Sequence, residues 1–366
     1  MSKIYGALYL GLTIFLTPIS AWGGANSDLR RAAHAGDLLH IRRALAQGAD
    51  ANAGDPGEGM TPLMWAASEG HLKVVRLLLA NGAHVDIRNN EGRTALMVAA
   101  RHGKNAVVKL LLDRGANVNV RDTRGSTALM RSAVSGHAAT VRLLLSHGAN
   151  PNTPDDNNGV TPLMAATFKG RMSVVRVLVD GGADTNLRNH FGGTALMGAA
   201  SANRGRIARV LIGHKASVNA KDDEGETSLI YAAASGATEV IPLLLSSRAN
   251  VNDQDRRGET ALMEAVWKGH AKIVRYLINA GADPLLADNS GHTAVALAVM
   301  TKNGKIGTFL RKRLKSSSMS RTRIVSSSGL AKNPKGTIVS SRTFQMEKSL
   351  HPRKGEEFPF AVPHPH

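Results

Sequence analysis

The chain has 366 residues, of which 43% are apolar and 4% aromatic, and it carries a formal net charge of +18. This composition suffices for a buried core made of Ala, Leu and Val, and the positive charge makes anionic partners a class to consider. The chain has no cysteine, which excludes thiol catalysis, disulfides, cysteine zinc sites and a bacterial lipoprotein anchor.

The N-terminus, MSKIYGALYLGLTIFLTPISAWGGANSD, has the layout of a secretory signal peptide. A short positive region precedes residues 4–17, which carry no charge, and small residues follow. We therefore expect a signal peptide over residues 1–25, with cleavage between about Ala21 and Ala25. The alternative is an uncleaved inner-membrane anchor over residues 4–21, because the apolar run is nearly long enough to cross a bilayer. Both interpretations place the remaining chain outside the cytosol, in the periplasm or secreted.

One motif then recurs every 33 or 34 residues. Clear copies are TPLMWAASEGHLKVVRLLLANGAHVD at residues 61–86 and TALMVAARHGKNAVVKLLLDRGANVN at residues 94–119. A catalytic motif normally occurs once per domain, whereas a phase held over residues 27–314 indicates structural building blocks. We predict nine copies, which start near residues 27, 61, 94, 127, 161, 194, 227, 260 and 293.

Each copy predicts two helices followed by a hairpin. The opening Thr is a good helix N-cap, and in two copies it is followed by Pro62 or Pro162, at the first helical position that proline favours. A small pair such as Ala66 and Ala67 lets neighbouring helices approach closely, and a VVRLLL-like run supplies the buried side of the second helix. Glycines end the helices, and a further glycine two residues before each Thr allows a tight turn.

A 33-residue helix-turn-helix-hairpin of this kind resembles the ankyrin repeat, over about four-fifths of the chain. The resemblance implies an all-α repeat solenoid of nine ankyrin repeats, each a helix-turn-helix plus a β-hairpin, in which no repeat can bury its apolar face alone. It also implies a non-enzymatic scaffold, expected as a monomer, that binds another protein through its concave groove and hairpin tips.

The sequence departs from the family at the position where ankyrin repeats usually carry the His of TPLH. We interpret the apolar column found there as packing between repeats, in preference to a soft metal path or an oxidation sensor, because it occupies a fixed position of the fold. The column consists of Met64, Met97, Met130, Met164, Met197, Ile230 and Met263.

The sixth and seventh copies are irregular at their helix ends. Asn203, Lys215 and Arg248 stand where other copies have glycine, and each left-handed residue other than glycine costs about 1 kcal/mol. Pro242 enters the second helix of the seventh copy near its start, where it is either tolerated or kinks the helix. We hypothesise that residues 200–250 form a softer joint.

Partner-binding candidates are the cations and aromatics at variable positions, because interface hot spots favour such side chains. The hairpins carry a basic column, interrupted at Asp155 and Gln254, that consists of Arg88, Arg121, Arg188 and Lys221. The first helices add Trp65, Arg101, Arg131, Phe168, Lys169, Tyr231, Trp267 and Lys268. A second basic column on the outer helices is interpreted as an ordinary solvated face; it contains Arg42, Arg76, Lys109, Arg142, Arg176, Arg209 and Arg275.

The sequence gives little support for catalysis or for a cofactor. The His residues that follow helix-ending glycines (His71, His137 and His270) recur in phase with the repeat, which indicates a structural role. The chain has no phosphate loop, no nucleophile elbow and no HExxH motif. We therefore predict no catalytic, cofactor-binding or metal site.

The C-terminal region changes character. In residues 311–366, 12 Lys and Arg oppose 3 Glu, so we predict a basic, Ser-rich and disordered tail over residues 315–366. This tail either keeps the protein soluble or adheres to an anionic surface: phospholipid, an envelope polymer or nucleic acid. Its closing PHPH offers a weak metal site as a minor alternative. An adhesin dominated by this tail, or an effector that acts on host proteins, remain the alternatives to the scaffold.

Overall fold

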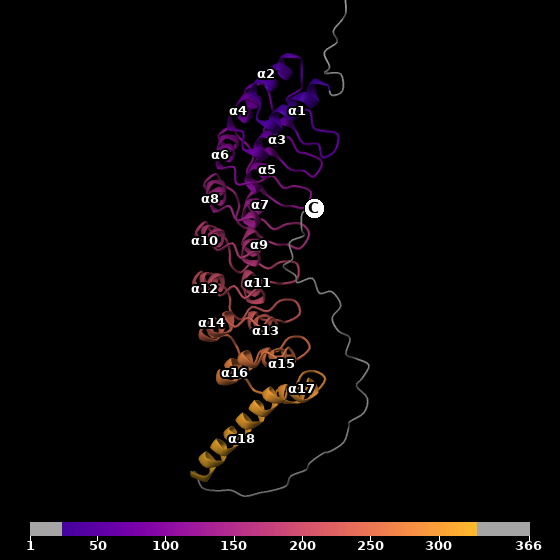
Figure 1. The fold of residues 1–366 in the computed structure, drawn as a ribbon. Helices are drawn as coiled ribbons and strands as arrows, with labels where there is room; N and C mark the ends of the chain where they lie inside the picture. Colours follow the sequence, from indigo (N-terminus) through magenta and orange to yellow (C-terminus); the bar gives the residue numbers. More distant parts are fainter. Residues whose placement is uncertain (1–23, 328–366) are drawn as a thin grey trace, which may run out of the picture. The chain divides into compact units, whose positions relative to one another are not determined.

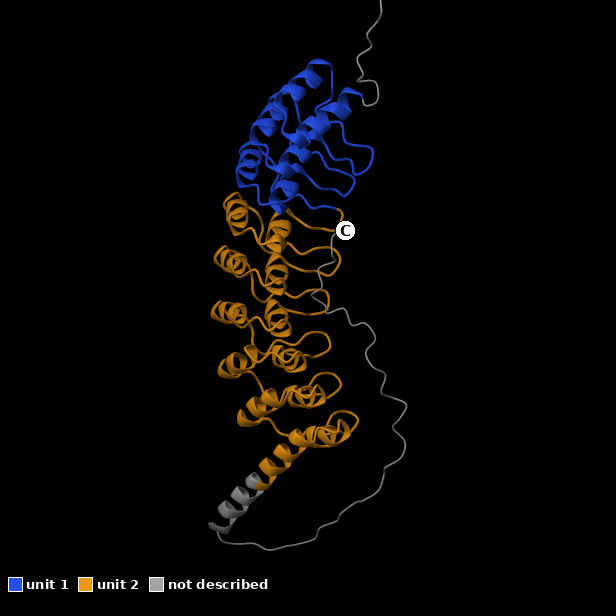
Figure 2. Ribbon diagram, viewed as in Figure 1, with its two compact units in different colours: residues 1–122 blue, residues 123–366 orange. Residues whose placement is uncertain are grey.

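The computed structural model describes the backbone of residues 24–327 and the side chains of residues 24–315. The chain divides into two compact units, unit 1 over residues 1–122 and unit 2 over residues 123–366 (Figure 2). The predicted signal peptide and the tail beyond residue 327 lie outside the described residues.

Unit 1 contains three helix pairs. The first helices of the pairs lie in one row next to the protruding loops, and the second helices form a parallel row on the side away from the loops (Figure 1). Neighbouring first helices pack on one another, as α1 does on α3 and α3 on α5. The helices are α1 (Ala25–Ala35), α2 (Leu38–Ala46), α3 (Pro62–Glu69), α4 (Leu72–Ala80), α5 (Ala95–Arg101) and α6 (Asn105–Asp113).

Unit 2 repeats the same arrangement six times. Its helices are α7 (Ala128–Ser135), α8 (Ala138–Ser146), α9 (Pro162–Phe168), α10 (Met172–Asp180), α11 (Ala195–Ser201), α12 (Gly205–Gly213), α13 (Ser228–Ala234), α14 (Val240–Ser246), α15 (Ala261–Trp267), α16 (Ala271–Asn279), α17 (Ala294–Met300) and α18 (Gly304–Ser327). The core of both units is formed by Leu, Val and Ala; Ala66 and Ala67, for example, are fully buried where first helices meet. The predicted all-α repeat fold is confirmed.

Threonine caps position the first helices, as predicted. The Thr61 hydroxyl accepts a hydrogen bond from the Met64 N–H at 3.3 Å, and the same bond recurs in each of the next seven repeats. This bond satisfies a backbone donor that the first turn of a helix leaves without a partner. The first repeat differs from the prediction, because α1 begins at Ala25 after Gly24, without a side-chain cap, and Ser27 lies inside the helix.

The hairpins are loops closed by a side chain. Residues 24–327 contain no named strand and only three isolated bridges, such as that between Lys221 and Thr227, so the predicted hairpins are tight turns with little ladder pairing. At Asn89 the side-chain oxygen accepts hydrogen bonds from the Glu91 and Arg93 N–H groups, at 3.1 and 2.8 Å. These Asx bonds replace ladder pairing within the short tip.

Asp155 belongs to this column of turn-closing residues. Its side chain is buried and accepts from the Asn158 and Val160 N–H groups, both at 3.0 Å. The prediction that Asp155 stands in the basic hairpin column and interrupts it is wrong, because Asp155 is a turn-closing residue like Asn89. The one-residue longer spacing between Thr127 and Thr161 displaces the hairpin register there.

The methionine column packs between helices. Each of its seven members is at most 5% exposed. In two repeats the sulfur also accepts a weak hydrogen bond: Met197 from the Thr194 N–H and Met263 from the Thr260 N–H, both at 3.4 Å. The packing interpretation of this column is confirmed.

The irregular helix ends of the sixth and seventh repeats are left-handed, as predicted. Asn203, Lys215 and Arg248 have φ values of 49°, 65° and 65°, and Lys302, which the sequence analysis did not single out, has a φ of 54°. Pro242 is tolerated, because α14 begins only at Val240 and a first-turn residue needs no intrahelical N–H donor. The softer joint over residues 200–250 stays a prediction.

The last helix extends further than the sequence suggests. Ile306 and Leu310 of α18 are buried, and α18 packs on α17. Its helical backbone then continues to Ser327. The predicted tail over residues 315–366 stays a prediction.

Candidate protein-binding surface

Three of the predicted hairpin cations are engaged by neighbouring repeats. Arg88 donates to the Arg121 carbonyl at 2.7 Å, and Lys221 donates to the Gln254 carbonyl at 3.0 Å. Arg188 instead pairs with the Asp223 carboxylate at 2.9 Å. These side chains are exposed but they tether one hairpin to the next, so their first role is structural.

Gln254 also belongs to this set of tethers. Its side-chain amide donates to the Ala287 carbonyl at 2.9 Å and to the Gly258 carbonyl at 2.6 Å. Gln254 interrupts the run of positive charges, as predicted, but it makes the same hairpin-to-hairpin contact as Lys221. The shared property of this position is therefore a long hydrogen-bond donor and not a charge.

Most first-helix candidates are half-buried. This group contains Trp65, Arg101, Arg131, Phe168 and Lys169, and the hairpin residue Arg121 behaves alike. Trp65 packs edge-on against His34, with ring centroids 5.1 Å apart. Such residues offer an edge to solvent, but not a whole side chain.

Tyr231 is buried, unlike the other candidates. Its hydroxyl donates to the Asp222 carboxylate at 2.7 Å. Burial, together with this acceptor, raises the pKa of Tyr231 far above its usual value near 10. Tyr231 therefore braces the hairpin that begins at Asp222, and little of it is available to a partner.

Trp267 and Lys268 are the most accessible pair among the predicted first-helix residues. Trp267 ends α15 and is 43% exposed, and Lys268 follows it in solvent. One repeat later, Met300 ends α17 and is 44% exposed, next to Val299 at 60%. Because α15 packs on α17, these apolar side chains lie at the same end of adjacent helices. We call Trp267, Lys268, Val299 and Met300 the α15–α17 surface.

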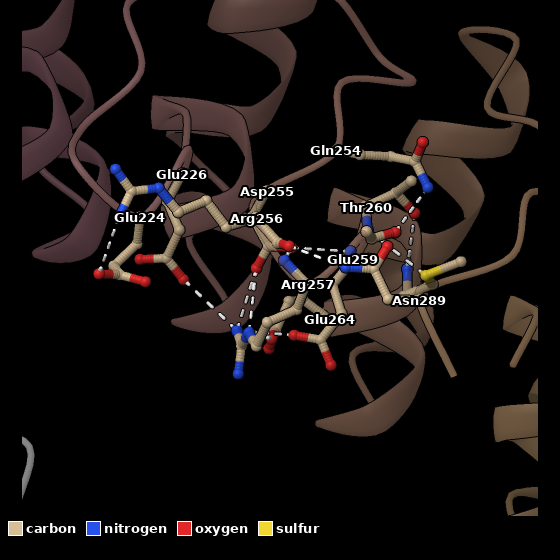
Figure 3. A network of polar contacts seen from close by, with 12 residues as sticks. Glu224, Glu226, Gln254, Asp255, Arg256, Arg257, Glu259, Thr260, Glu264 and Asn289 are labelled. Carbon is tan, nitrogen blue, oxygen red and sulfur yellow. Dashed lines mark hydrogen bonds and ion pairs between the residues drawn. The ribbon is translucent and has the colours of Figure 1, made fainter. Parts of the chain in front are cut away.

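A charged network surrounds Arg257 (Figure 3). The Arg257 guanidinium lies 2.6 Å from Glu259, 3.1 Å from Asp255, 3.8 Å from Glu226 and 3.9 Å from Glu264. Burial by itself lowers the pKa of Arg257, but the negative charges of Glu259 and Asp255 outweigh that effect and raise it. Four carboxylates around one cation leave the network with a negative surplus.

The sequence patterns do not predict this network. Its members come from two successive hairpins and from α15, and Glu226 and Glu259 share one repeat position, directly before Thr227 and Thr260. The signal available in the sequence is the dense run DQDRRGE at residues 253–259, together with Glu264 in a helix whose equivalents carry no acid at that position. Glu264 precedes Trp267 by three residues, so the two share one face of α15.

Comparison with known proteins identifies the repeat. Family models of ankyrin repeats match residues 29–122, 107–189 and 181–255, and a second such model matches residues 243–298. The chain is an ankyrin repeat protein. Proteins of this family generally bind other proteins through their repeats.

A curated protein with a similar segment is the 2-5A-dependent ribonuclease of Mus musculus. It is 41% identical over 58 residues, which amount to 16% of this chain and 8% of the ribonuclease. The likeness therefore concerns the ankyrin repeats, and the chain spans only a small part of that relative.

Two further observations concern the described part of the chain. Within residues 24–327 no helix combines the length and apolar character needed to cross a bilayer. Among the same residues no three His, Asp or Glu side chains gather in the way a metal ion requires.

Proposed function

We propose that this ankyrin repeat protein is a non-enzymatic scaffold that holds a protein partner outside the cytosol, with the α15–α17 surface as its principal contact. Exposed Trp267 carries the proposal, because a large aromatic side chain beside Met300 offers the kind of anchor that dominates protein interfaces. The negative surplus around Arg257 favours a partner segment that combines apolar and basic side chains.

The location outside the cytosol is supported by the first residues of the sequence. The Gly24 carbonyl accepts from the Ser27 N–H at 2.7 Å, so a cut between Ala21 and Gly24 leaves the start of α1 intact. The mass of the purified mature protein tests this: loss of 21 to 23 residues is expected. A protein that keeps Met1 and stays in the cytosolic fraction would contradict the proposal.

Site-specific crosslinking tests the contact surface. A photoreactive residue introduced at Met300 is expected to crosslink to a defined partner, and Trp267→Ala should reduce that crosslink by at least about tenfold, as loss of a hot spot does. Leu39→Ala is the matched control, because Leu39 is an apolar residue that is 74% exposed on α2 of unit 1 and is not part of this surface. Equal crosslinking in wild type and Trp267→Ala would contradict the assignment.

The second candidate, an adhesin driven by the basic tail, is favoured by the surplus of Lys and Arg in residues 311–366. Deletion of residues 328–366 separates the two functions, because it leaves α18 whole. If the scaffold proposal is right, this deletion leaves the crosslink at Met300 unchanged. If the tail dominates, the deletion removes binding while Trp267→Ala does not.

A further inference from the structure

A second feature of unit 2 is an open concavity of about 580 Å³ in the fourth to sixth repeats, where first helices turn into second helices. Its lining includes three arginines (Arg171, Arg176 and Arg206) and two serines (Ser135 and Ser173). No carboxylate lines it. Its lining comes from the ends of first helices and the starts of second helices, and it shares no residue with the α15–α17 surface.

Arg171 is held in place at the rim of this concavity. Its Nε donates to the Val134 carbonyl at 3.1 Å. Its side chain also lies over Gly136, where an added Cβ would come within 3.0 Å of the Arg171 Cδ. Little side-chain entropy is therefore left to lose when Arg171 meets a ligand.

Arg176 and Arg206 are exposed, and neither makes a hydrogen bond or ion pair within the described part of the chain. They come from adjacent second helices, α10 and α12, which pack on each other. Ser173 lies three residues before Arg176, on the same face of α10. Arg206 occupies in α12 the position that Ser173 occupies in α10, so both helices contribute a polar group at the same level.

The start of α10 adds a further positive feature. Arg171 is its N-cap residue and provides no side-chain acceptor to the first turn. The Met172 N–H donates to the Gly170 carbonyl at 3.0 Å, so the Ser173 and Val174 N–H groups are those left for an anion at this helix end, which carries a partial positive charge. Two arginines without partners, a third held at the rim and an uncapped helix end thus meet at one concavity.

The helix pairs of these three repeats contribute little negative charge, and in the next repeat the Glu239 side chain lies beside Gly205, the neighbour of Arg206 in sequence. In residues 127–150, 161–183 and 194–216, nine Lys and Arg oppose a single carboxylate, Asp180. The nearest partner of Asp180 is His214, at 3.6 Å. The nine cations are Arg131, Arg142, Lys169, Arg171, Arg176, Arg204, Arg206, Arg209 and Lys215.

We propose that this concavity binds a phosphate group, through Arg176, Arg206 and the start of α10. Arginine suits this ligand because its planar fork of donors matches phosphate oxygens, and a serine hydroxyl such as that of Ser173 adds a further donor. Free phosphate and the headgroup of a phosphatidate lipid share this chemistry, and the experiment distinguishes them.

The test uses the full chain and two probes, inorganic phosphate followed by calorimetry and vesicles of phosphatidylcholine with or without phosphatidic acid followed by co-sedimentation. Arg176→Gln with Arg206→Gln should weaken binding of the active probe by at least about tenfold, since each charged hydrogen bond is worth that much or more. Arg142→Gln with Arg209→Gln removes the same charge outside the concavity and should change binding less than about twofold.

The outcomes separate cleanly. Binding of phosphate identifies a soluble ligand, and binding only of phosphatidate vesicles identifies a membrane headgroup. Equal losses in the two double variants, or no binding of either probe to wild type, overturn the proposal.

Ser173→Asp provides a variant that keeps the fold, because a carboxylate at a helix start stabilises the helix while it repels phosphate. It should lose binding with no fall in melting temperature.

Discussion

Unit 2 contains arginines in two opposite environments. Arg257 is surrounded by four carboxylates, of which Asp255 has a side chain that is only 2% exposed. Arg176 and Arg206 lie in solvent around a concavity without acids. Both settings stand on the same helix-turn-helix backbone. The repeat thus fixes where side chains stand, while the residues at variable positions decide whether a charge supports the fold or remains available to a ligand.

The largest expected effect follows from reversing the charge at Arg257. Arg257→Glu would place five carboxylates together and should destabilise the seventh and eighth repeats by about 2–3 kcal/mol, less than for a fully buried pair because Arg257 is half exposed. Hydrogen exchange over residues 222–267 measures the loss locally. Arg176→Glu is the matched control and should change exchange little; equal effects would abolish the contrast between the two sites.

Tyr231 is a second polar side chain that supports the fold, through its hydrogen bond to Asp222 in the hairpin before that of Arg257. Tyr231→Phe removes the hydrogen bond to Asp222 and should cost about 1–2 kcal/mol at pH 7. Because folding raises the pKa of Tyr231, its stabilising effect is complete below pH 10 and is lost as the pH rises above that value. Urea denaturation at pH 8 and pH 11 should therefore show a steeper alkaline loss in wild type than in Tyr231→Phe. Parallel losses would contradict the assignment.

Between Arg206 and Arg257 in the sequence, Lys215 and Arg248 have a left-handed backbone that is strained for residues other than glycine. Lys215→Gly and Arg248→Gly should each stabilise unit 2 by about 0.5–1 kcal/mol, because glycine adopts their positive φ without a Cβ penalty. Hydrogen exchange should slow within residues 200–250 and stay constant elsewhere. Uniform protection across all repeats of wild type would remove the proposed softer joint.

The smallest expected effect concerns the stability of the concavity. Arg176→Gln with Arg206→Gln should alter the free energy of unfolding by no more than about 0.5 kcal/mol, since exposed side chains without partners contribute little. Urea denaturation in phosphate-free buffer measures this. A loss of several kcal/mol would mean that these arginines support the fold, as Arg257 does.

Much of the scaffold is predictable from sequence because its signals are local. The Thr caps, the left-handed glycines and the apolar column follow from a residue and its near neighbours, and all three are confirmed. Asp155 was misplaced because a single added residue shifts the hairpin register. The length of α18 up to Ser327 has no apolar period in the sequence to indicate it, whereas buried Ile306 and Leu310 anchor its start.

The candidate site was harder to predict, because side-chain partners come from other repeats. Arg88 and Lys221 look like free cations in the sequence, yet each donates to a backbone carbonyl one repeat later. Arg257 gathers acids from positions 31 residues before and seven residues after it, which no periodic pattern marks. Trp267 is a predicted partner-binding candidate that lies 43% exposed, and no sequence pattern indicates the acidic network that includes Glu264.

The buried methionines can report local unfolding, because each becomes open to oxidation only when its repeat opens. Six of them occupy one repeat position from Met64 in the second repeat to Met263 in the eighth, with Ile230 in their place in the seventh, and in the folded protein solvent scarcely reaches their side chains. Dilute peroxide would mark only those repeats that open long enough to admit it. Mass spectrometry of the resulting peptides would then give a footprint of where each unit comes apart first, without any introduced label.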